Sequence, residues 1–234
     1  MNKSFRNTCR MHMVKLDNNR KTAFTLAEVL ITLGIIGVVA AMTMPTIIGK
    51  TQKTTIENRL KHFYSTINQA VAHAEVEYGD KTEWDLPAAD PTGETMFAWL
   101  EKYIIPYIKV VRVDKKCYGN NPCLYFEDGS KILVSIPDLL VYYPVAKSRG
   151  NIRGKDCFSF MFIPSGVDHP LGKGKGVEPY AGIANEGGTD LTTGSYGCRS
   201  QNTACIGGEL LNMNCTRMIM ENGWKIPENY PIKF

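Results

Sequence analysis

The chain has 234 residues, of which 44% are hydrophobic and 21% are charged, and its formal net charge is +4. This composition excludes a disordered chain, and the length suits one domain with extra elements better than two full cores. The positive charge lies in residues 1–23, which carry six basic side chains and one acidic one, whereas the rest of the chain carries 21 basic and 22 acidic ones. The overall charge is therefore no reason to predict a nucleic-acid-binding protein.

Residues 24–48 form an apolar segment of 25 residues in which Glu28 is the single charged side chain. As a helix this segment would be about 37 Å long, enough to cross a hydrocarbon core of about 30 Å. The basic residues before it favour a cytoplasmic N-terminus and place the rest of the chain outside. A secretory signal peptide has a shorter apolar region, and an ordinary signal anchor leaves Glu28 unexplained, because a carboxylate in lipid costs about 2.5–3.5 kcal/mol.

Residues 21–29, with the sequence KTAFTLAEV, resemble the prepilin cleavage and methylation motif of type IV pilins and type II secretion pseudopilins. In that family a prepilin peptidase cuts on the cytoplasmic face before the aromatic residue, and the new amine is methylated. The resemblance implies cleavage between Ala23 and Phe24, N-methylation of Phe24, and a role in assembly for Glu28. Pro45 stands where such proteins commonly have a helix-loosening proline.

Two features depart from the family pattern. Ala23 stands where the family usually has glycine, and the leader of residues 1–23 is longer than usual. Translation from Met11 or Met13 instead of Met1 would leave a leader of 13 or 11 residues.

The expected role of Glu28 follows from its charge. Cleavage would create an amine at Phe24, and in a helical assembly the amine of an incoming subunit would pair with the Glu28 carboxylate of a neighbour. Either charge alone is costly in lipid, whereas the pair is much less so. The alternative is a carboxylate that snorkels to the membrane interface.

Beyond Gly49 the apolar residues recur at steps of three and four along one helical face, and Gly79 follows as a stop. These residues are Ile56, Leu60, Phe63, Tyr64, Ile67, Ala70, Val71, Ala74 and Tyr78. We predict one helix over residues 24–78, apolar all round in its first half and amphipathic in its second. Proline removes a backbone donor, so a kink or a melted stretch is expected at Pro45.

The rest of the chain predicts a globular head that contains both helices and strands. We expect a helix over residues 92–105, and a β-hairpin over 123–136 in which Asp128 and Gly129 favour a type I′ turn. A further strand is expected over residues 157–163.

The last third of the chain predicts less regular structure. Residues 166–208, which are rich in Gly, Thr, Ser and Asn, are expected to form long loops. Helical spacing returns over residues 209–222, and Gly223 follows as the expected C-cap.

The predicted fold class is α+β and pilin-like, with a long N-terminal helix packed on a small antiparallel sheet head whose loops are stapled by disulfides. Four regions are expected. They are a basic prepilin leader (1–23), a transmembrane half of the helix (24–48), an amphipathic half of the same helix (49–79) and a globular head (80–234).

Cys9 lies in the leader, and six further cysteines lie in the second half of the chain: Cys117, Cys123, Cys157, Cys198, Cys205 and Cys215. An even count behind an export-type segment predicts disulfides in an oxidising compartment, with reduced thiols in a cytosolic protein as the alternative. The cysteine spacings are wider than those of zinc sites, and no histidine follows at finger spacing.

Six cysteines allow fifteen connectivities. We favour local pairs Cys117–Cys123 and Cys198–Cys205, because both loops carry turn-prone Gly or Asn. The remaining pair, Cys157–Cys215, would join a strand to the last helix.

The sequence contains none of the common catalytic motifs, and we expect no enzymatic activity, no metal and no cofactor. His62 and His73 would lie about 16 Å apart along the helix, too far to share a metal ion. Four carboxylates are scattered over the loop region without the pattern of a calcium loop, so calcium has no support from the sequence. These are Asp168, Glu178, Glu186 and Asp190.

The sequence therefore favours a structural subunit of a type IV pilus or a type II secretion pseudopilus, processed by prepilin peptidase and assembled through its N-terminal helix. Its expected partners are prepilin peptidase, other pilin-like subunits in a helical filament, the inner-membrane assembly platform and membrane lipid. We expect one pass through the cytoplasmic (inner) membrane with the head outside, and then a filament in the periplasm or at the cell surface. Major and minor subunits of pili, pseudopili and DNA-uptake systems share these features.

The alternative is a monomeric, single-pass, membrane-anchored binding module on the extracytoplasmic side. Such a module has no need of the junction between Ala23 and Phe24, or of Glu28.

Overall fold

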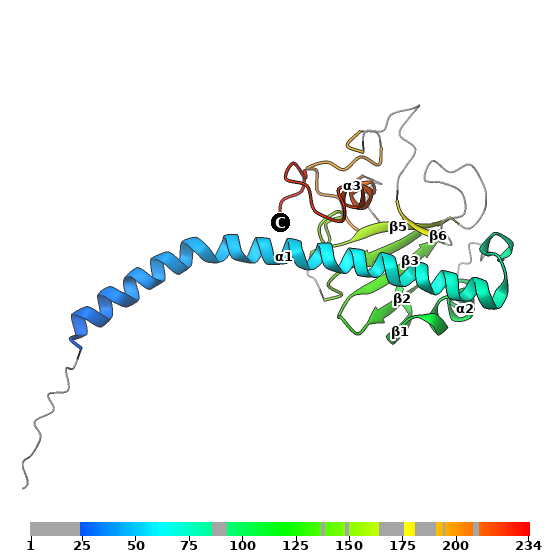
Figure 1. Ribbon diagram of the computed structural model, residues 1–234, viewed down its shortest axis with the longest axis horizontal. Helices are drawn as coiled ribbons and strands as arrows, with labels where there is room; N and C mark the ends of the chain where they lie inside the picture. Colours follow the sequence, from blue (N-terminus) through cyan, green and yellow to red (C-terminus); the bar gives the residue numbers. More distant parts are fainter. Residues whose placement is uncertain are drawn as a thin grey trace, which may run out of the picture. The chain divides into compact units, whose positions relative to one another are not determined.

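The computed structural model describes eight segments of the chain: residues 24–85, 93–136, 139–147, 150–163, 176–180, 191–193, 195–207 and 211–234. Its contacts divide the chain into two compact units, Met1–Thr46 and Ile47–Phe234, which we describe separately. The second half of the long helix belongs to the same unit as the sheet (Figure 1).

The long helix α1 spans Leu26–Tyr78 and confirms the helix predicted from the apolar periodicity. It ends at Gly79, whose φ of 82° is left-handed and whose N–H donates to the Glu75 carbonyl at 3.0 Å. A glycine in this conformation commonly ends a helix, because it has no Cβ to oppose a positive φ. The backbone is helical through Pro45, so of the two expected alternatives the melted stretch is not seen there, and a kink at Pro45 stays a prediction.

Six strands in the described part of the head form one antiparallel sheet in the order β1-β2-β3-β4-β5-β6, each strand beside the next in sequence (Figure 1). They are β1 (Val110–Tyr118), β2 (Asn121–Phe126), β3 (Lys131–Ile136), β4 (Leu139–Tyr143), β5 (Phe158–Ile163) and β6 (Gly176–Pro179). The sheet therefore has β1 and β6 as its two edge strands.

One face of this sheet packs against the second half of α1 and forms the main core. Phe63 of α1 stacks on Tyr142 of β4 with ring centroids 4.2 Å apart, and meets Phe160 of β5 edge-on at 5.0 Å. Successive strand side chains point to opposite faces, so every second residue of a strand reaches this core. The strand residues of the core include Leu124, Ile132, Val134, Leu140, Tyr142, Phe158, Phe160 and Phe162.

The opposite face of the sheet carries a second, smaller cluster of buried side chains. Its members are Cys123, Leu133, Val141, Tyr143, Cys157 and Cys205. Three of the six are disulfide-forming cysteines, so this layer of the head is held by covalent bonds as well as by apolar packing.

The hairpin predicted over residues 123–136 is present as β2 and β3, but the expected type I′ turn is wrong. Gly129 has a φ of 78°, whereas Asp128 is not in the left-handed region that a type I′ turn requires. Gly129 N–H donates to the Phe126 carbonyl at 3.1 Å, and Phe126 N–H donates to the Ser130 carbonyl at 3.0 Å. The loop therefore has three residues that end in a left-handed glycine, the usual alternative to the two-residue hairpin.

Shorter helices flank the sheet. The helix expected over residues 92–105 is α2, Glu94–Tyr103, followed by the 3-10 turn η2, Ile105–Tyr107; a second turn, η1, spans Lys81–Glu83. Residue 92, the expected cap, lies outside the described residues, and Gly93 occupies the N-cap position.

The last helix, α3, spans Cys215–Glu221 and is shorter than the helix expected over residues 209–222. Residues 208–210 lie outside the described segments, and Asn212 has a left-handed φ of 63° that interrupts the helical run. Its buried side chain accepts from Arg199 N–H at 2.7 Å and donates to the Gln201 carbonyl at 2.6 Å. These bonds tie Asn212 to the preceding loop instead of to a helix. Gly223, with φ 67°, follows α3 as expected.

Residues 166–208 were expected to be loops throughout, but four of them form β6. Much of this region, including His169 and the glycines and lysines of residues 171–175, lies outside the described residues.

Candidate functional site

The start of α1 is a capping box formed by Thr25 and Glu28. Thr25 donates its N–H and its hydroxyl to Glu28 Oε2 at 2.8 and 2.9 Å, and Glu28 N–H donates to Thr25 Oγ1 at 3.2 Å. This reciprocal arrangement satisfies backbone donors that the first turn of a helix leaves without partners. This capping box was not among the predictions, although Thr25 followed three residues later by Glu28 before an apolar run is the sequence signature of such a box.

Phe24, the residue expected to follow the cut, is 85% exposed beside this capping box. Ala23 and the rest of the leader lie outside the described residues. The expected cleavage site and methylation site therefore stay predictions.

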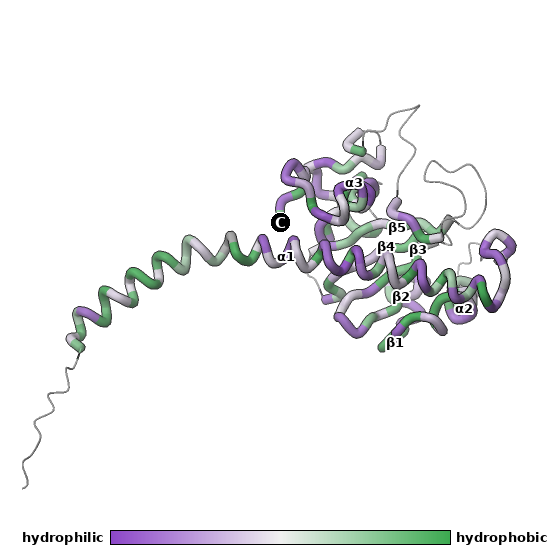
Figure 2. Tube along the Cα trace, viewed as in Figure 1, coloured by the Kyte–Doolittle hydropathy of each residue, from purple (hydrophilic) through white to green (hydrophobic). Residues whose placement is uncertain are grey.

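The segment of α1 before Pro45 exposes nearly all of its apolar side chains. Ile31, Ile35 and Ile36 are each more than 60% exposed, and Figure 2 shows that most of the segment is apolar. In the described residues, α1 alone is long and apolar enough to cross a membrane, and none of its apolar window is buried. Such a surface is unfavourable in water and suits lipid or a bundle of similar helices.

Within the head, α1 closes one edge of the sheet through Asn68. Its side-chain amide donates to the Val177 carbonyl of β6 at 2.8 Å, and Val177 N–H donates to Asn68 Oδ1 at 2.9 Å. An adjacent contact is made by Tyr64, whose hydroxyl donates to the buried Glu178 carboxylate at 2.9 Å. Burial and this bond raise the pKa of Tyr64 to about 12. The edge strand is thus paired with side chains of the helix and is not open to another chain.

Glu57 of α1 connects this helix to the residues that follow α3. Its side chain is buried, and it accepts from the Ile226 N–H at 2.9 Å and from Lys225 Nζ at 2.8 Å. Trp224, which directly precedes Lys225, packs on Tyr64 with ring centroids 5.0 Å apart.

Arg59 joins α1 to the loop between β2 and β3 and to the residues that follow β4. Its guanidinium donates to the Pro144 carbonyl and, at 2.6 Å, to the Asp128 carbonyl, and the Asp128 carboxylate lies 3.8 Å away. The helix is therefore bonded to the edge strand β6, to two loops of the sheet and to the C-terminal residues, which makes the second half of α1 an integral part of the head.

All six cysteines of the head form disulfides, and one of the three pairs is the one expected. Cys117 pairs with Cys123 across the tight connection between β1 and β2. The expected pairs Cys198–Cys205 and Cys157–Cys215 are wrong, because Cys157 pairs with Cys205 and Cys198 pairs with Cys215.

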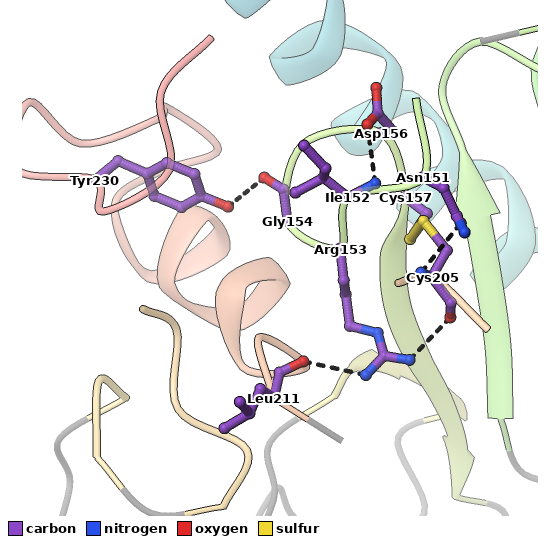
Figure 3. Close-up of a disulfide and its surroundings, with 9 residues drawn as sticks. All are labelled: Asn151, Ile152, Arg153, Gly154, Asp156, Cys157, Cys205, Leu211 and Tyr230. Carbon is purple, nitrogen blue, oxygen red and sulfur yellow. Dashed lines mark hydrogen bonds between the residues drawn. A yellow bond between two sulfur atoms is a disulfide. The ribbon is translucent and has the colours of Figure 1, made fainter. Parts of the chain in front are cut away.

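The pairing of Cys157 with Cys205 follows from a short antiparallel contact between residues 151–153 and 203–205. Arg153 N–H donates to the Thr203 carbonyl at 2.8 Å, and Cys205 N–H donates to the Asn151 carbonyl at 3.2 Å. A turn that includes Gly154 then brings Cys157 back beside Arg153, opposite Cys205 (Figure 3). The partner of Cys157 is therefore selected by backbone pairing between distant segments.

A buried arginine and a buried tyrosine brace the same disulfide (Figure 3). Arg153 donates to the Cys205 carbonyl at 2.8 Å and to the Leu211 carbonyl at 3.1 Å, and burial lowers the pKa of its guanidinium. Tyr230 donates its hydroxyl to the Gly154 carbonyl at 2.5 Å, and burial raises its pKa. These contacts link the disulfide to the turn before α3 and to the last residues of the sequence.

The second corrected pair has a similar cause. Asn212 N–H donates to the Gly197 carbonyl at 3.0 Å, and Asn214 N–H donates to the Tyr196 carbonyl at 3.1 Å. Residues 212–214 therefore run beside residues 196–197, and Cys215 at the start of α3 meets Cys198.

The head also has an open groove of about 590 Å³ between α1, β2 and β4, lined among others by Phe63, Ile67, Phe126 and Tyr142. No three His, Cys, Asp or Glu side chains of the described segments lie together as a metal site requires. Three of the four scattered carboxylates, Asp168, Glu186 and Asp190, lie outside those segments, and Glu178 is bonded to Tyr64.

These features define a pilin-like α+β protein. The helix α1 has an apolar, capped start, its second half packs on a six-stranded antiparallel sheet, and three disulfides hold the head. Residues 18–44 match the prokaryotic N-terminal methylation motif, which spans the expected junction, Phe24 and Glu28. The chain is thus a pilin-type or pseudopilin-type precursor of the kind that prepilin peptidase processes.

Residues 46–234, most of the chain, match the family of unknown function DUF6613, and the chain belongs to that family. It matches no curated protein. It also matches no solved structure.

Proposed function

We propose that this protein is a structural subunit of a type IV pilus or a type II secretion pseudopilus, cut between Ala23 and Phe24, methylated at Phe24 and assembled through the first half of α1. The observation that carries the proposal is the exposure of the apolar helix segment behind an N-terminal methylation motif. A helix with apolar residues on every side suits lipid before assembly and a bundle of identical helices after it.

The architecture of the head supports a structural role. Its disulfides, buried aromatic core and helix-closed sheet edge resist local unfolding, as a subunit under mechanical load requires. Pilin-like proteins with the N-terminal methylation motif are structural proteins, and we propose that the head of this chain has no catalytic activity. The proposed partners are prepilin peptidase, other pilin-like subunits and the inner-membrane assembly platform.

The proposed location is the cytoplasmic membrane, with the N-terminus inside and the head outside, followed by a filament in the periplasm or at the cell surface. The basic residues of the leader support this orientation. The disulfides support an oxidising compartment for the head.

The test combines the mass of the native N-terminus with the state of assembly. Mass spectrometry of protein from its own membranes should find N-methyl-Phe24 as the first residue, and sheared cells or membranes should release filaments that contain it. An intact leader, or a cut beyond Pro45, would overturn the proposed processing. A processed chain found as a monomer under every condition would favour the membrane-anchored binding module instead.

A further inference from the structure

The base of the head carries a group of lysines around Phe234. The ammonium groups of Lys53 and Lys155 lie 5.8 and 5.9 Å from the centroid of the Phe234 ring. Lys155 also donates to the Lys233 carbonyl at 2.8 Å, and Lys233 itself is exposed. We call Lys53 and Lys155, together with the exposed Lys50 and Lys233 next to them and to Phe234 in the sequence, the lysine cluster. The Phe234 ring is half-buried, with its centroid 5.9 Å from that of Tyr230.

Chain continuity places this cluster close to the end of the apolar segment. Ile48 is the last apolar residue of that segment, and a Cβ on Gly49 would lie 3.9 Å from the Phe234 carbonyl oxygen. Lys50 and Lys53 follow Ile48 on the same helix by about 3 and 7.5 Å of rise. The polar headgroup layer extends roughly 5–8 Å beyond the hydrocarbon core on each side.

Within the described residues, no lysine of the cluster forms an ion pair with a side-chain carboxylate, and the main-chain carboxylate of Phe234 offsets one of the four positive charges. The two nearby carboxylates are engaged elsewhere, since Glu57 binds Lys225 and the Ile226 N–H, and Asp156 accepts from the Ile152 N–H at 2.9 Å. The far end of the helix has the opposite character, with the exposed acidic residues Glu77, Asp80 and Glu83.

We propose that the lysine cluster and Phe234 form a docking surface for anionic phospholipid headgroups of the membrane that residues 24–48 cross. The ring of Phe234 suits the boundary between headgroups and acyl chains, and the four ammonium groups suit lipid phosphates. Lipid contact holds the head on the membrane surface before assembly, and filament growth breaks it. This inference rests on the proposed membrane insertion, which the experiment measures separately.

The experiment uses the full chain in vesicles, with the photo-crosslinking residue p-benzoylphenylalanine in place of Phe234. After irradiation, mass spectrometry should find lipid adducts at residue 234 several times more often in phosphatidylglycerol vesicles than in phosphatidylcholine vesicles. The same crosslinker at Val111, which is 63% exposed on β1, should form few lipid adducts.

Charge variants test the role of the lysines. The triple substitution Lys50→Gln, Lys53→Gln and Lys233→Gln should lower the adduct yield in phosphatidylglycerol at least fivefold, since one lysine near an anionic surface is worth roughly a factor of five in binding. The matched control Lys109→Gln, Lys115→Gln and Lys116→Gln removes the same charge from exposed sites at β1 and should leave the yield unchanged. Arginine at positions 50, 53 and 233 should restore it.

Equal adduct yields in the two lipids, or crosslinks from residue 234 to a second copy in place of lipid, would overturn the proposal. Carbonate extraction of the same vesicles tests the anchor itself. A chain that resists extraction but forms no lipid adducts refutes the docking surface alone, whereas an extractable chain refutes the proposed function together with it.

Discussion

Asn68 of α1 and Val177 of β6 exchange two hydrogen bonds, at 2.8 and 2.9 Å, as two strands of a sheet would. The amide side chain of Asn68 thus imitates a backbone peptide unit and completes the edge of the sheet from the helix. Leucine at position 68 has nearly the same shape but leaves the N–H and the carbonyl of Val177 without partners. Each such buried group costs about 1–3 kcal/mol.

We therefore expect Asn68→Leu to lower the free energy of unfolding of the head by about 2–4 kcal/mol. Unfolding of the full chain in detergent can be followed by the fluorescence of the buried Trp84 and Trp99. The exposed neighbour Gln69 offers a control, because Gln69→Ala should change stability by less than about 0.5 kcal/mol. Equal midpoints for the two variants would mean that β6 is not held by Asn68.

The Glu57 carboxylate makes two contacts of unequal importance, and two substitutions should separate them. Glu57→Ala leaves the Ile226 N–H without its acceptor inside the head and should destabilise it by about 2–3 kcal/mol. Lys225→Gln removes an ion pair whose lysine side chain is 64% exposed, so its effect should stay below about 1 kcal/mol. The same detergent unfolding assay measures both. A larger loss from the lysine variant would reverse this ranking.

The long helix was predictable because its apolar residues recur with one unmistakable period from Ile56 to Tyr78. The edge strand β1 was not, because Arg112, Asp114 and the two following lysines interrupt its apolar pattern. A strand at the edge of a sheet exposes more of its side chains, and charges there discourage pairing with another chain. Strand β6 was missed because it lies in a glycine-rich stretch and is held mainly by β5 and Asn68, neither of which is local in sequence.

The disulfide connectivity shows the same limit of local reasoning. The tight pair Cys117–Cys123 was predictable, because only five residues stand between the two cysteines, across a turn. The partners of Cys157 and Cys215 depend on which distant loops run beside them, and no spacing rule contains that information. The capping box at Thr25, by contrast, was visible in the sequence and was overlooked.

The three disulfides should contribute unequally to stability. Cross-linking restricts the unfolded chain more when the closed loop is longer, and the sequence separations are 48, 17 and 6 residues for Cys157–Cys205, Cys198–Cys215 and Cys117–Cys123. Loop entropy alone gives losses of about 4, 3 and 2 kcal/mol for removal of each pair by double Cys→Ser substitution.

Peptide mapping without reduction checks the pairs themselves, and chemical unfolding of the three double variants checks their order. Peptides that join Cys198 to Cys205 would contradict the connectivity. A largest loss from the Cys117–Cys123 variant would show that native contacts, and not loop closure, dominate the stabilisation.

Tyr64 gives the head a defined sensitivity to alkaline pH. Burial, followed by its hydrogen bond to Glu178, raises the pKa of Tyr64 to about 12. Because the folded pKa lies above the unfolded value of about 10, the stabilisation is complete below pH 10 and is lost as the pH rises to 12. Tyr64→Phe should make unfolding less dependent on pH in that window, with Tyr118, which is 48% exposed, as the site of a control substitution. Identical pH profiles for wild type and Tyr64→Phe would contradict this.

The capping box changes how the role of Glu28 has to be tested. In the single chain the Glu28 carboxylate is already bonded to Thr25, so a substitution can act by weakening the helix start or by removing the charge. Glutamine can occupy the same place in a capping box, whereas valine cannot. Loss of the cap alone costs about 0.5–2 kcal/mol of helix stability.

We predict that Glu28→Gln and Glu28→Val both lower the yield of filaments at least tenfold, because each leaves the amine of the neighbouring Phe24 without a counter-charge in an apolar bundle. Thr25→Ala weakens the cap but keeps the carboxylate, and should assemble close to the wild-type level. Membrane insertion should be equal or easier in the two Glu28 variants, since each removes a charge that costs about 2.5–3.5 kcal/mol in lipid. The measurements are filament yield after shearing, the mass of the processed N-terminus, and the amount of subunit in the membrane fraction. Normal filaments from the glutamine variant but not from the valine variant would show that helix capping, and not charge pairing, is what assembly requires of Glu28.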